Sequence, residues 1–176
     1  MGRVRRTHIH FLLALLALIL ARPSPTTDAI GTTLVALGLG VRVWAAGVLE
    51  KGGGLCTNGP YRWVRHPLYL GSLIAALGLC VMTNSAWGWA VILPIFLVLY
   101  WFQVKLEERR LAEEFGDLHT QYARTVPMML PAPPRVAGGG REWQLSRAVK
   151  NREHYHVAVT CALVALFYLR NLSPRV

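Results

Sequence analysis

Two short stretches of the sequence hold the side chains that could do chemistry. The first, GPYRWVRHPLYLG at residues 59–71, sets basic and aromatic side chains directly before a long apolar run. The second is the carboxylate pair Glu107 and Glu108, which follows another apolar run. Ionisable side chains held at membrane depth cost free energy and are commonly functional. We therefore take the two stretches together as the candidate site.

Each of these side chains also has a structural explanation when it is taken alone. Arg65 could anchor the chain at the membrane interface, and His66 could simply start a helix before Pro67. Glu107 and Glu108 could belong to a solvated helix face that pairs with nearby arginines. Their occurrence together, beside apolar runs, favours a functional site.

Two apolar runs should bring the candidate residues to one end of a hairpin. We expect helices at residues 68–85 and 86–104, joined by the tight turn TNSAWGW, with a kink at Pro94. Because these helices would be antiparallel, His66 at the start of one and Glu107 at the end of the other must be near neighbours.

Further helices should surround this hairpin. We expect a short first helix at 9–21, a turn at 22–28 in which a Thr or Asp caps the next helix, and a second span at 29–49. Four glycines should let a neighbouring helix approach this span closely. They are Gly31, Gly38, Gly40 and Gly47.

The chain becomes amphipathic after the hairpin. Residues 105–131 should form a helix along the membrane or over the bundle. Its apolar positions are Leu106, Leu111, Phe115, Leu118 and Tyr122. A linker follows at 131–140, and residues 155–169 form a last apolar stretch that can make a fifth helix. The predicted fold class is therefore all-α, a polytopic membrane bundle of about five hydrophobic helices.

Composition and charge agree with a membrane protein. Of the 176 residues, 53% are apolar and 16% are charged, and the formal net charge is +10. The basic residues fall on one side of the predicted topology, which places the candidate site in the cytoplasm. No nucleic-acid-binding motif is present, so we expect the lipid bilayer as partner and no nucleic acid. The three cysteines lack disulfide or zinc spacing, and we expect no metal.

Arg42 is a separate candidate within the second apolar span. It could extend its charged end to the cytoplasmic interface while its stem stays in the membrane. Alternatively it could turn inward toward a carboxylate, on a substrate or on Glu107. The sequence leaves both interpretations open.

The two candidate stretches together carry a resemblance to a known family. NGPYRWVRHPLYLG, an apolar hairpin and then KLEERRLAEEFGDLHTQYARTVPMMLP resemble the isoprenylcysteine carboxyl methyltransferases, over roughly residues 42–131. In that family of integral membrane enzymes the C-terminal region binds S-adenosylmethionine at the cytosolic face, and the acceptor enters from the bilayer. The resemblance divides the chain into membrane helices at 1–49, a catalytic hairpin with a cytosolic cofactor-binding segment at 50–131, and a linker, basic tail and hydrophobic helix at 132–176.

The resemblance also implies roles for individual side chains. It sets around the cofactor Tyr61, Arg65, His66, Tyr69, Glu107, Glu108, Tyr122 and Arg124. As candidate catalytic residues we take Arg42, His66 and Glu107. Arg65 can pair with the cofactor carboxylate, a glutamate can accept from the amino or ribose groups, and aromatic rings can hold the sulfonium. His119 departs from the pattern, since a tyrosine is usual at its position.

Several functions remain compatible with these residues. The leading hypothesis is methyl transfer from S-adenosylmethionine to a lipophilic acceptor, with S-adenosylhomocysteine as product. The acceptor could be a prenylated cysteine carboxylate, a phospholipid amine, or a small thiol or acid. A carboxylate or thiolate needs no strong base, whereas an amine or alcohol would need one, and His66 would be the candidate. The alternatives are an NADPH-dependent membrane reductase of the sterol-reductase type and a non-catalytic membrane protein.

Overall fold

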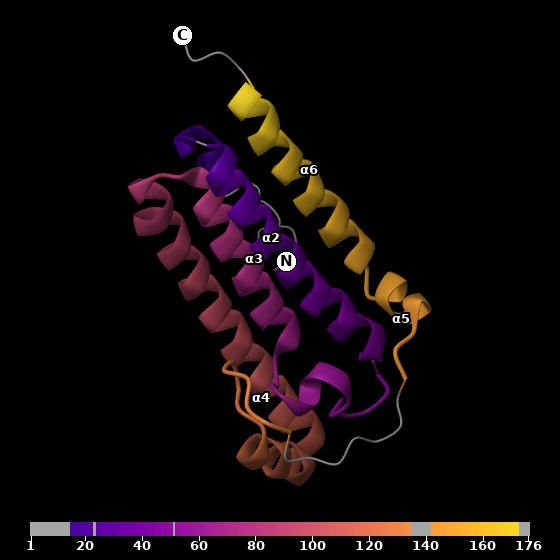
Figure 1. Ribbon diagram of the computed structural model, residues 1–176. Coiled ribbons are helices and arrows are strands. Elements are labelled where there is room, and N and C mark those ends of the chain that lie inside the picture. The colour runs from indigo at the N-terminus through magenta and orange to yellow at the C-terminus, as the bar shows by residue number, and fades with distance from the viewer. Residues whose placement is uncertain (1–14, 23, 51, 135–141, 173–176) are drawn as a thin grey trace, which may run out of the picture.

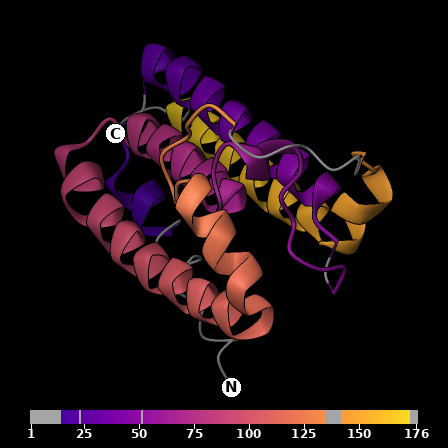
Figure 2. The same cartoon turned by 90° about the horizontal axis from the view of Figure 1, so that it is seen from below.

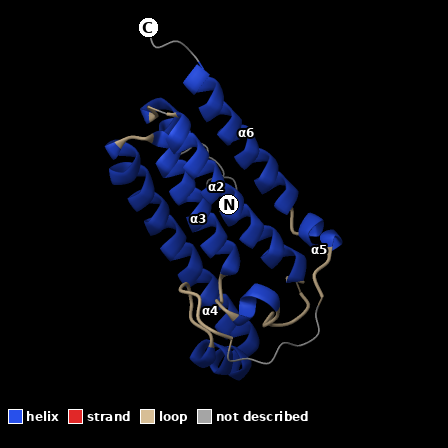
Figure 3. Ribbon diagram, in the orientation of Figure 1, coloured by secondary structure: helices blue, strands red, loops and turns tan. Residues whose placement is uncertain are grey.

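The apolar runs fold into roughly aligned helices in the computed structural model (Figure 1), which describes residues 15–22, 24–50, 52–134 and 142–172. The longer helices are α2 (Pro25–Val48), α3 (Pro67–Thr83), α4 (Leu93–Thr125) and α6 (Glu153–Leu172). The short ones are the 3-10 turn η1 (Gly59–Arg62), the π-turn η2 (Gly88–Ile92) and α5 (Leu145–Lys150). The described ranges contain no strand (Figure 3), so the predicted all-α class is confirmed.

Three of the helices are long and apolar enough to cross a membrane. They are Pro25–Val48, Gly88–Thr125 and Glu153–Leu172. A fourth helix, Pro67–Thr83, is apolar but shorter. The last of the three confirms the predicted helix at 155–169. Of the predicted first helix at 9–21, residues 15–20 are helical, and residues 9–14 lie outside the described part of the chain.

Glycines bring α2 and α3 into backbone contact. A Cβ at Gly38 would lie 2.5 Å from the carbonyl oxygen of Gly71, and a Cβ at Gly78 would lie 2.6 Å from that of Gly31. Only glycine permits such an approach, as predicted for Gly31 and Gly38. The prediction was wrong for Gly40, which has nothing within 4 Å of its Cβ position. The α2–α3 pair is thus a close-packed unit that fixes where α3 begins.

The ends of α2 and α3 follow local sequence signals. Ser24 caps α2 by accepting from the Thr27 amide, and Pro25 occupies the first turn. The expected Thr takes part in this cap, because the Thr27 hydroxyl accepts from the Ser24 amide over 3.1 Å, but the N-cap residue is Ser24 and the helix begins four residues before the predicted start. At the other side of the bundle α3 ends at Asn84, whose left-handed backbone makes the turn into α4.

Two irregularities occur between Gly88 and Thr125. The π-turn η2 ends at Ile92, two residues before Pro94, which has no amide hydrogen to give to the preceding turn. A sharp break occurs at Gly116, where φ is 50° and ψ is −119°. The last part of α4 therefore turns back across the end of the bundle (Figure 2), which is one of the two placements expected for the amphipathic segment.

The C-terminal helices pack on α2. The Trp143 indole donates to the Val43 carbonyl oxygen over 3.1 Å, and Asn151 donates to the carbonyl oxygens of Ala46 and Leu49, each over 2.8 Å. At the far end Asn171 donates to Asp28 over 3.0 Å. Helix α6 thus lies along the length of α2 (Figure 1). The three cysteines are free thiols, in agreement with the expected absence of a disulfide framework.

Candidate functional site

The segment before α3 is held in place by the chain that returns after α4. The Tyr122 hydroxyl donates to the Tyr61 carbonyl oxygen over 2.7 Å. The Arg65 amide donates to the Pro127 carbonyl oxygen over 2.9 Å, and the Ala132 amide donates to that of Trp63 over 3.0 Å. Three backbone positions within five residues are therefore fixed by the return segment, which depends on the turn at Gly116.

The first turn of α3 presents two side chains to α4. His66 is the N-cap residue of α3 and makes no side-chain capping bond, so its imidazole is available for tertiary contacts. Its Nε2 donates to Oε1 of Glu108 over 2.6 Å. One turn on, the Tyr69 hydroxyl donates to Oε2 of Glu107 over 2.7 Å. The predicted meeting of the two hairpin ends is confirmed, but His66 pairs with Glu108 rather than with Glu107.

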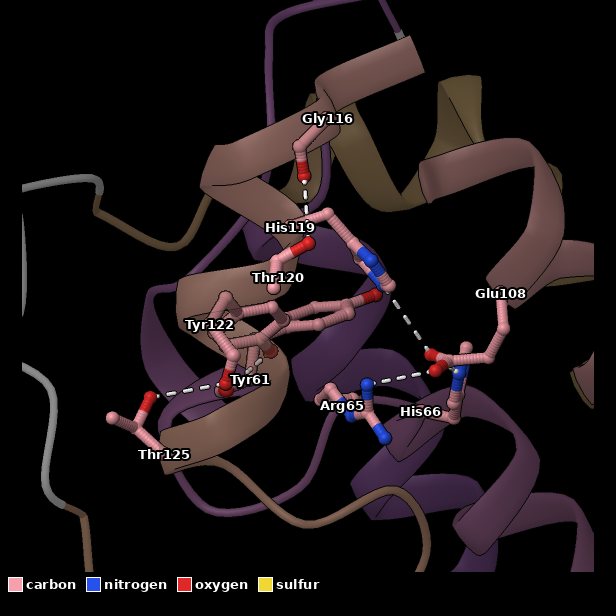
Figure 4. A network of polar contacts seen from close by, with 9 residues as sticks. All are labelled: Tyr61, Arg65, His66, Glu108, Gly116, His119, Thr120, Tyr122 and Thr125. Carbon is pink, nitrogen blue, oxygen red and sulfur yellow. Dashed lines mark hydrogen bonds and ion pairs between the residues drawn. The ribbon is translucent and has the colours of Figure 1, made fainter. Parts of the chain in front are cut away.

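Glu108 is the centre of the polar cluster (Figure 4), which comprises Arg65, His66, Glu108 and His119. Nη1 of Arg65 lies 2.7 Å from Oε2 of Glu108, and His119 Nε2 lies 3.7 Å from Oε1. The side chain of Glu108 is 17% exposed and that of Arg65 is 12% exposed. An ion pair this far removed from water needs good geometry to offset desolvation. The two short bonds to Glu108 supply that geometry.

Three polar atoms of this region are buried and lack a hydrogen-bond partner among the described residues. They are the Tyr61 hydroxyl, Nε of Arg65 and Nε2 of His119. Burial raises the pKa of Tyr61 well above its ordinary value, so the hydroxyl stays protonated and can donate. Buried polar groups are normally satisfied, so each of these atoms calls for a further partner, such as a water, an ion or a ligand. The cluster can therefore offer hydrogen bonds beyond those it makes internally.

An aromatic series extends from the cluster between α3 and α4. The Tyr69 ring meets His66 edge to face at 5.7 Å and meets Tyr100 in the same way at 5.5 Å. Tyr100 stacks on Phe96 at 3.9 Å between ring centroids. The charged cluster thus continues into an aromatic surface that the sequence analysis did not identify.

The structure separates two predicted residues from this cluster. Arg124 is exposed on the last turn of α4 and makes no polar contact with the cluster. Arg42 turns inward, but its carboxylate partner is Glu153 of α6, at 2.6 Å, and not Glu107. Of the two interpretations left open for Arg42, the inward turn toward a carboxylate is therefore the observed one, with Glu153 rather than Glu107 as the partner. That any of the predicted residues contacts a cofactor stays a prediction.

Sequence reasoning gave no chemical role to two buried residues, His119 and Glu153. His119 was noted only as a departure from the family pattern. A glycine inside a predicted helix, Gly116, followed one turn later by a histidine was a usable signal. Glu153 is the one acidic residue at the start of the last apolar stretch, and a buried arginine in a span needs such a partner. Among the described residues no group of three or more His, Cys, Asp or Glu side chains is arranged to hold a metal ion.

Comparison with known proteins gives this geometry a context. The family described as phospholipid methyltransferase matches residues 26–118, which include α2, α3 and the candidate glutamates. Methanethiol S-methyltransferase 1 of Bradyrhizobium diazoefficiens is 38% identical over 71 residues, 40% of this chain and 24% of its own length. Protein-S-isoprenylcysteine O-methyltransferase of Schizosaccharomyces pombe is 37% identical over 83 residues, 46% of this chain and 34% of its own length.

A longer match joins the chain to a protein named for metal resistance. The cobalt-zinc-cadmium resistance protein CzcN of Cupriavidus metallidurans is 36% identical over 108 residues, 60% of this chain and 48% of that protein. The match thus spans about half the length of that relative and less of the two methyltransferases. No solved structure matches the chain significantly.

Proposed function

The chain belongs to the phospholipid methyltransferase family, and we propose that it transfers a methyl group from S-adenosylmethionine to an acceptor that reaches the site from the membrane. Relatives named as methyltransferases and three helices of membrane-spanning length support a membrane methyltransferase. The use of this cofactor, the acceptor and the cytoplasmic location of the site are the proposed parts.

The observation that carries the proposal is the set of unpartnered atoms around the Glu108 carboxylate. Tyr61, Arg65 and His119 each hold one buried polar atom without a partner. Leaving such atoms unsatisfied costs about 1–3 kcal/mol each, so a ligand that satisfies them gains affinity. Arg65 can donate to an anionic group, and the nearby carboxylates can accept from an ammonium or hydroxyl group. S-adenosylmethionine carries all of these groups, and the donor set therefore fits it.

Each side chain has a defined task in this proposal. Arg65 binds the cofactor carboxylate through a guanidinium that the Glu108 bond keeps oriented. Glu107 and Glu108 accept hydrogen bonds from its amino or hydroxyl groups. The rings of Tyr61 and Tyr69 stabilise a positive charge by cation–π attraction. When bound, the cofactor supplies an electrophilic methyl group on its sulfonium sulfur.

Methyl transfer needs alignment and exclusion of water more than acid or base strength. The return segment after Gly116 covers the site and buries both Tyr61 and Tyr122. His66 is engaged by Glu108, so it is poorly placed to remove a proton from an acceptor. An acceptor that is already ionised, a thiolate or a carboxylate, suits these residues best. The names of the two methyltransferase relatives specify sulfur and oxygen acceptors, which agrees with this choice.

Orientation in the membrane follows from the distribution of charge. The ends of α2, α3 and α4 that carry the site also carry Arg62, Arg65, Lys105, Arg109 and Arg110. Loops rich in lysine and arginine face the cytoplasm in most membrane proteins. We accordingly assign the site to the cytoplasmic face.

The experiment that tests the function is a methyl-transfer assay on the protein in lipid nanodiscs. S-adenosylmethionine labelled in its methyl group is offered with a small alkanethiol, a prenylcysteine carboxylate or phosphatidylethanolamine. Glu108→Gln is the test variant, and Glu114→Gln, an exposed glutamate of the same helix, is its matched control. Label in the thiol or carboxylate product that depends on Glu108 and not on Glu114 supports the proposal. Label in the amine alone overturns the choice of acceptor, and label in none of them, without cofactor binding, overturns the function.

A further inference from the structure

Arg42 joins three helices through one side chain. From α2, its Nε donates to Oε1 of Glu153 over 2.6 Å, and its Nη2 donates to Oε2 over 3.0 Å. Nη1 donates to the Leu68 carbonyl oxygen over 3.2 Å and to the Ser72 hydroxyl, both in α3. The side chains of Arg42 and Glu153 are only 13% and 4% exposed. Arg42 and Glu153 thus form a buried bidentate ion pair, and the same guanidinium is hydrogen-bonded to α3.

The bonding of Arg42 argues against contact with a substrate. A guanidinium has five N–H donors. One at Nε, one at Nη2 and two at Nη1 are used, which makes four. Freeing the group for a substrate would leave the Glu153 carboxylate buried without its partner, which is strongly unfavourable. The contacts of Arg42 therefore do not support the catalytic role expected for it.

Arg42 instead holds the part of α3 that carries the candidate site. Leu68 lies between His66 and Tyr69, the two residues that contact the glutamates of α4. The stem of Arg42 crosses Gly71 so closely that a Cβ there would lie 2.7 Å from Cγ of Arg42. The bonds to α3 thus fix the height and rotation of its first turns against α2.

We propose that Arg42 and Glu153 are positioning residues for the candidate site. Glu153 orients the Arg42 guanidinium, and Arg42 holds the start of α3 so that His66 meets Glu108 and Tyr69 meets Glu107. Glu153 lies beyond the family match, which ends at residue 118. The C-terminal helix α6 thereby becomes part of the working unit of this chain.

The experiment separates positioning from simple docking of α6. Glu153→Gln and Arg42→Lys weaken the link to α3, since a lysine cannot bind a carboxylate and a carbonyl oxygen with the geometry of a guanidinium. Asn151→Ala is the matched control, because it removes two bonds between the C-terminal segment and α2 without touching α3. The double variant Arg42→Glu with Glu153→Arg restores opposite charges but leaves no guanidinium on α2. Three readouts are taken: amide hydrogen exchange of residues 66–72, S-adenosylhomocysteine affinity by calorimetry, and the thermal melt.

If Arg42 and Glu153 are positioning residues, Arg42→Lys and Glu153→Gln should each increase the rate of amide hydrogen exchange at residues 66–72. They should also weaken S-adenosylhomocysteine binding by about fivefold to tenfold, the size of an indirect coupling. Asn151→Ala should change neither quantity, and the double variant should recover thermal stability without recovering affinity. Equal effects of Asn151→Ala and Glu153→Gln, or full recovery of affinity in the double variant, would overturn the proposal.

The affinity readout rests on the proposed function, whereas the exchange readout does not. If the wild-type chain fails to bind S-adenosylhomocysteine but exchange at 66–72 responds only to the ion-pair variants, the positioning role stands and the proposed function falls. If exchange at 66–72 is unchanged in Arg42→Lys and Glu153→Gln, the positioning role falls whatever the ligand does.

Discussion

Replacing Glu108 by glutamine removes one charge from the centre of the cluster and keeps the shape of the side chain. Glu108 accepts a bond from Arg65 at 2.7 Å and one from His66 at 2.6 Å. A hydrogen bond to a charged group contributes about 1.5–3 kcal/mol, and a neutral one contributes about 0.5–1.5 kcal/mol. The free energy of unfolding of the variant should therefore be lower by about 1 kcal/mol for each bond, and by about 2 kcal/mol in total.

Ligand binding should weaken by a similar amount, because the ligand loses a charged acceptor at Glu108 and Arg65 loses the bond that orients it. In the proposed site the carboxylate both orients Arg65 and accepts from the ligand. A loss of about 2 kcal/mol corresponds to a roughly 30-fold weaker affinity for S-adenosylhomocysteine. Calorimetry on the detergent-purified protein measures this directly. We also expect His66→Ala to weaken binding by more than Arg42→Lys does, because Arg42 acts only through α3.

The control for Glu108→Gln is Glu114→Gln, which makes the same charge change at an exposed position of α4. Exposed charges contribute little, so its affinity should stay within about twofold of the wild-type value. Equal affinities in Glu108→Gln, Glu114→Gln and the wild-type chain, with all three folded, would refute the reasoning.

Three further substitutions, with Gly40→Ala as the control for the first, test the framework around the site. Gly78→Ala should lower thermal stability by about 1–3 kcal/mol, because its Cβ would lie 2.6 Å from the Gly31 carbonyl oxygen, whereas Gly40→Ala, with open space at its Cβ, should be nearly neutral in the same melt. Gly116→Ala has room for its Cβ but must adopt a φ of 50° and a ψ of −119°, so it should cost about 1–3 kcal/mol and weaken ligand binding; unchanged melting and binding would contradict a role for this turn. Tyr122→Phe removes the 2.7 Å bond to the Tyr61 carbonyl oxygen and should cost about 1 kcal/mol in the melt, and a cost near zero would show that other contacts hold the return segment.

Much of the fold could be predicted because it depends on local patterns. Apolar runs of helical length gave the spans, and the tight turn between two of them gave the hairpin. The hairpin in turn predicted that the start of α3 and the charged part of α4 lie together, as the bonds of His66 and Tyr69 confirm. Gly31 and Gly38 were identified as close-contact positions for the same reason, since small residues in a span commonly face another helix.

The remaining features depend on contacts between distant parts of the chain. Which glutamate meets His66 is decided by the rotation of α4 about its axis, and a one-residue difference moves the partner from Glu107 to Glu108. The break at Gly116 redirects the amphipathic segment, which leaves Arg124 exposed and buries His119. The partner of Arg42 is set by where α6 docks, 111 residues along the chain.

The central claim is that the Glu108 cluster binds S-adenosylmethionine. The most direct test is calorimetry of the purified wild-type chain with S-adenosylhomocysteine and, separately, with NADPH, each repeated on Glu108→Gln. The account predicts saturable binding of S-adenosylhomocysteine that Glu108→Gln weakens by roughly 30-fold, and no binding of NADPH. Binding of NADPH, or no binding of either ligand by the folded protein, would contradict it.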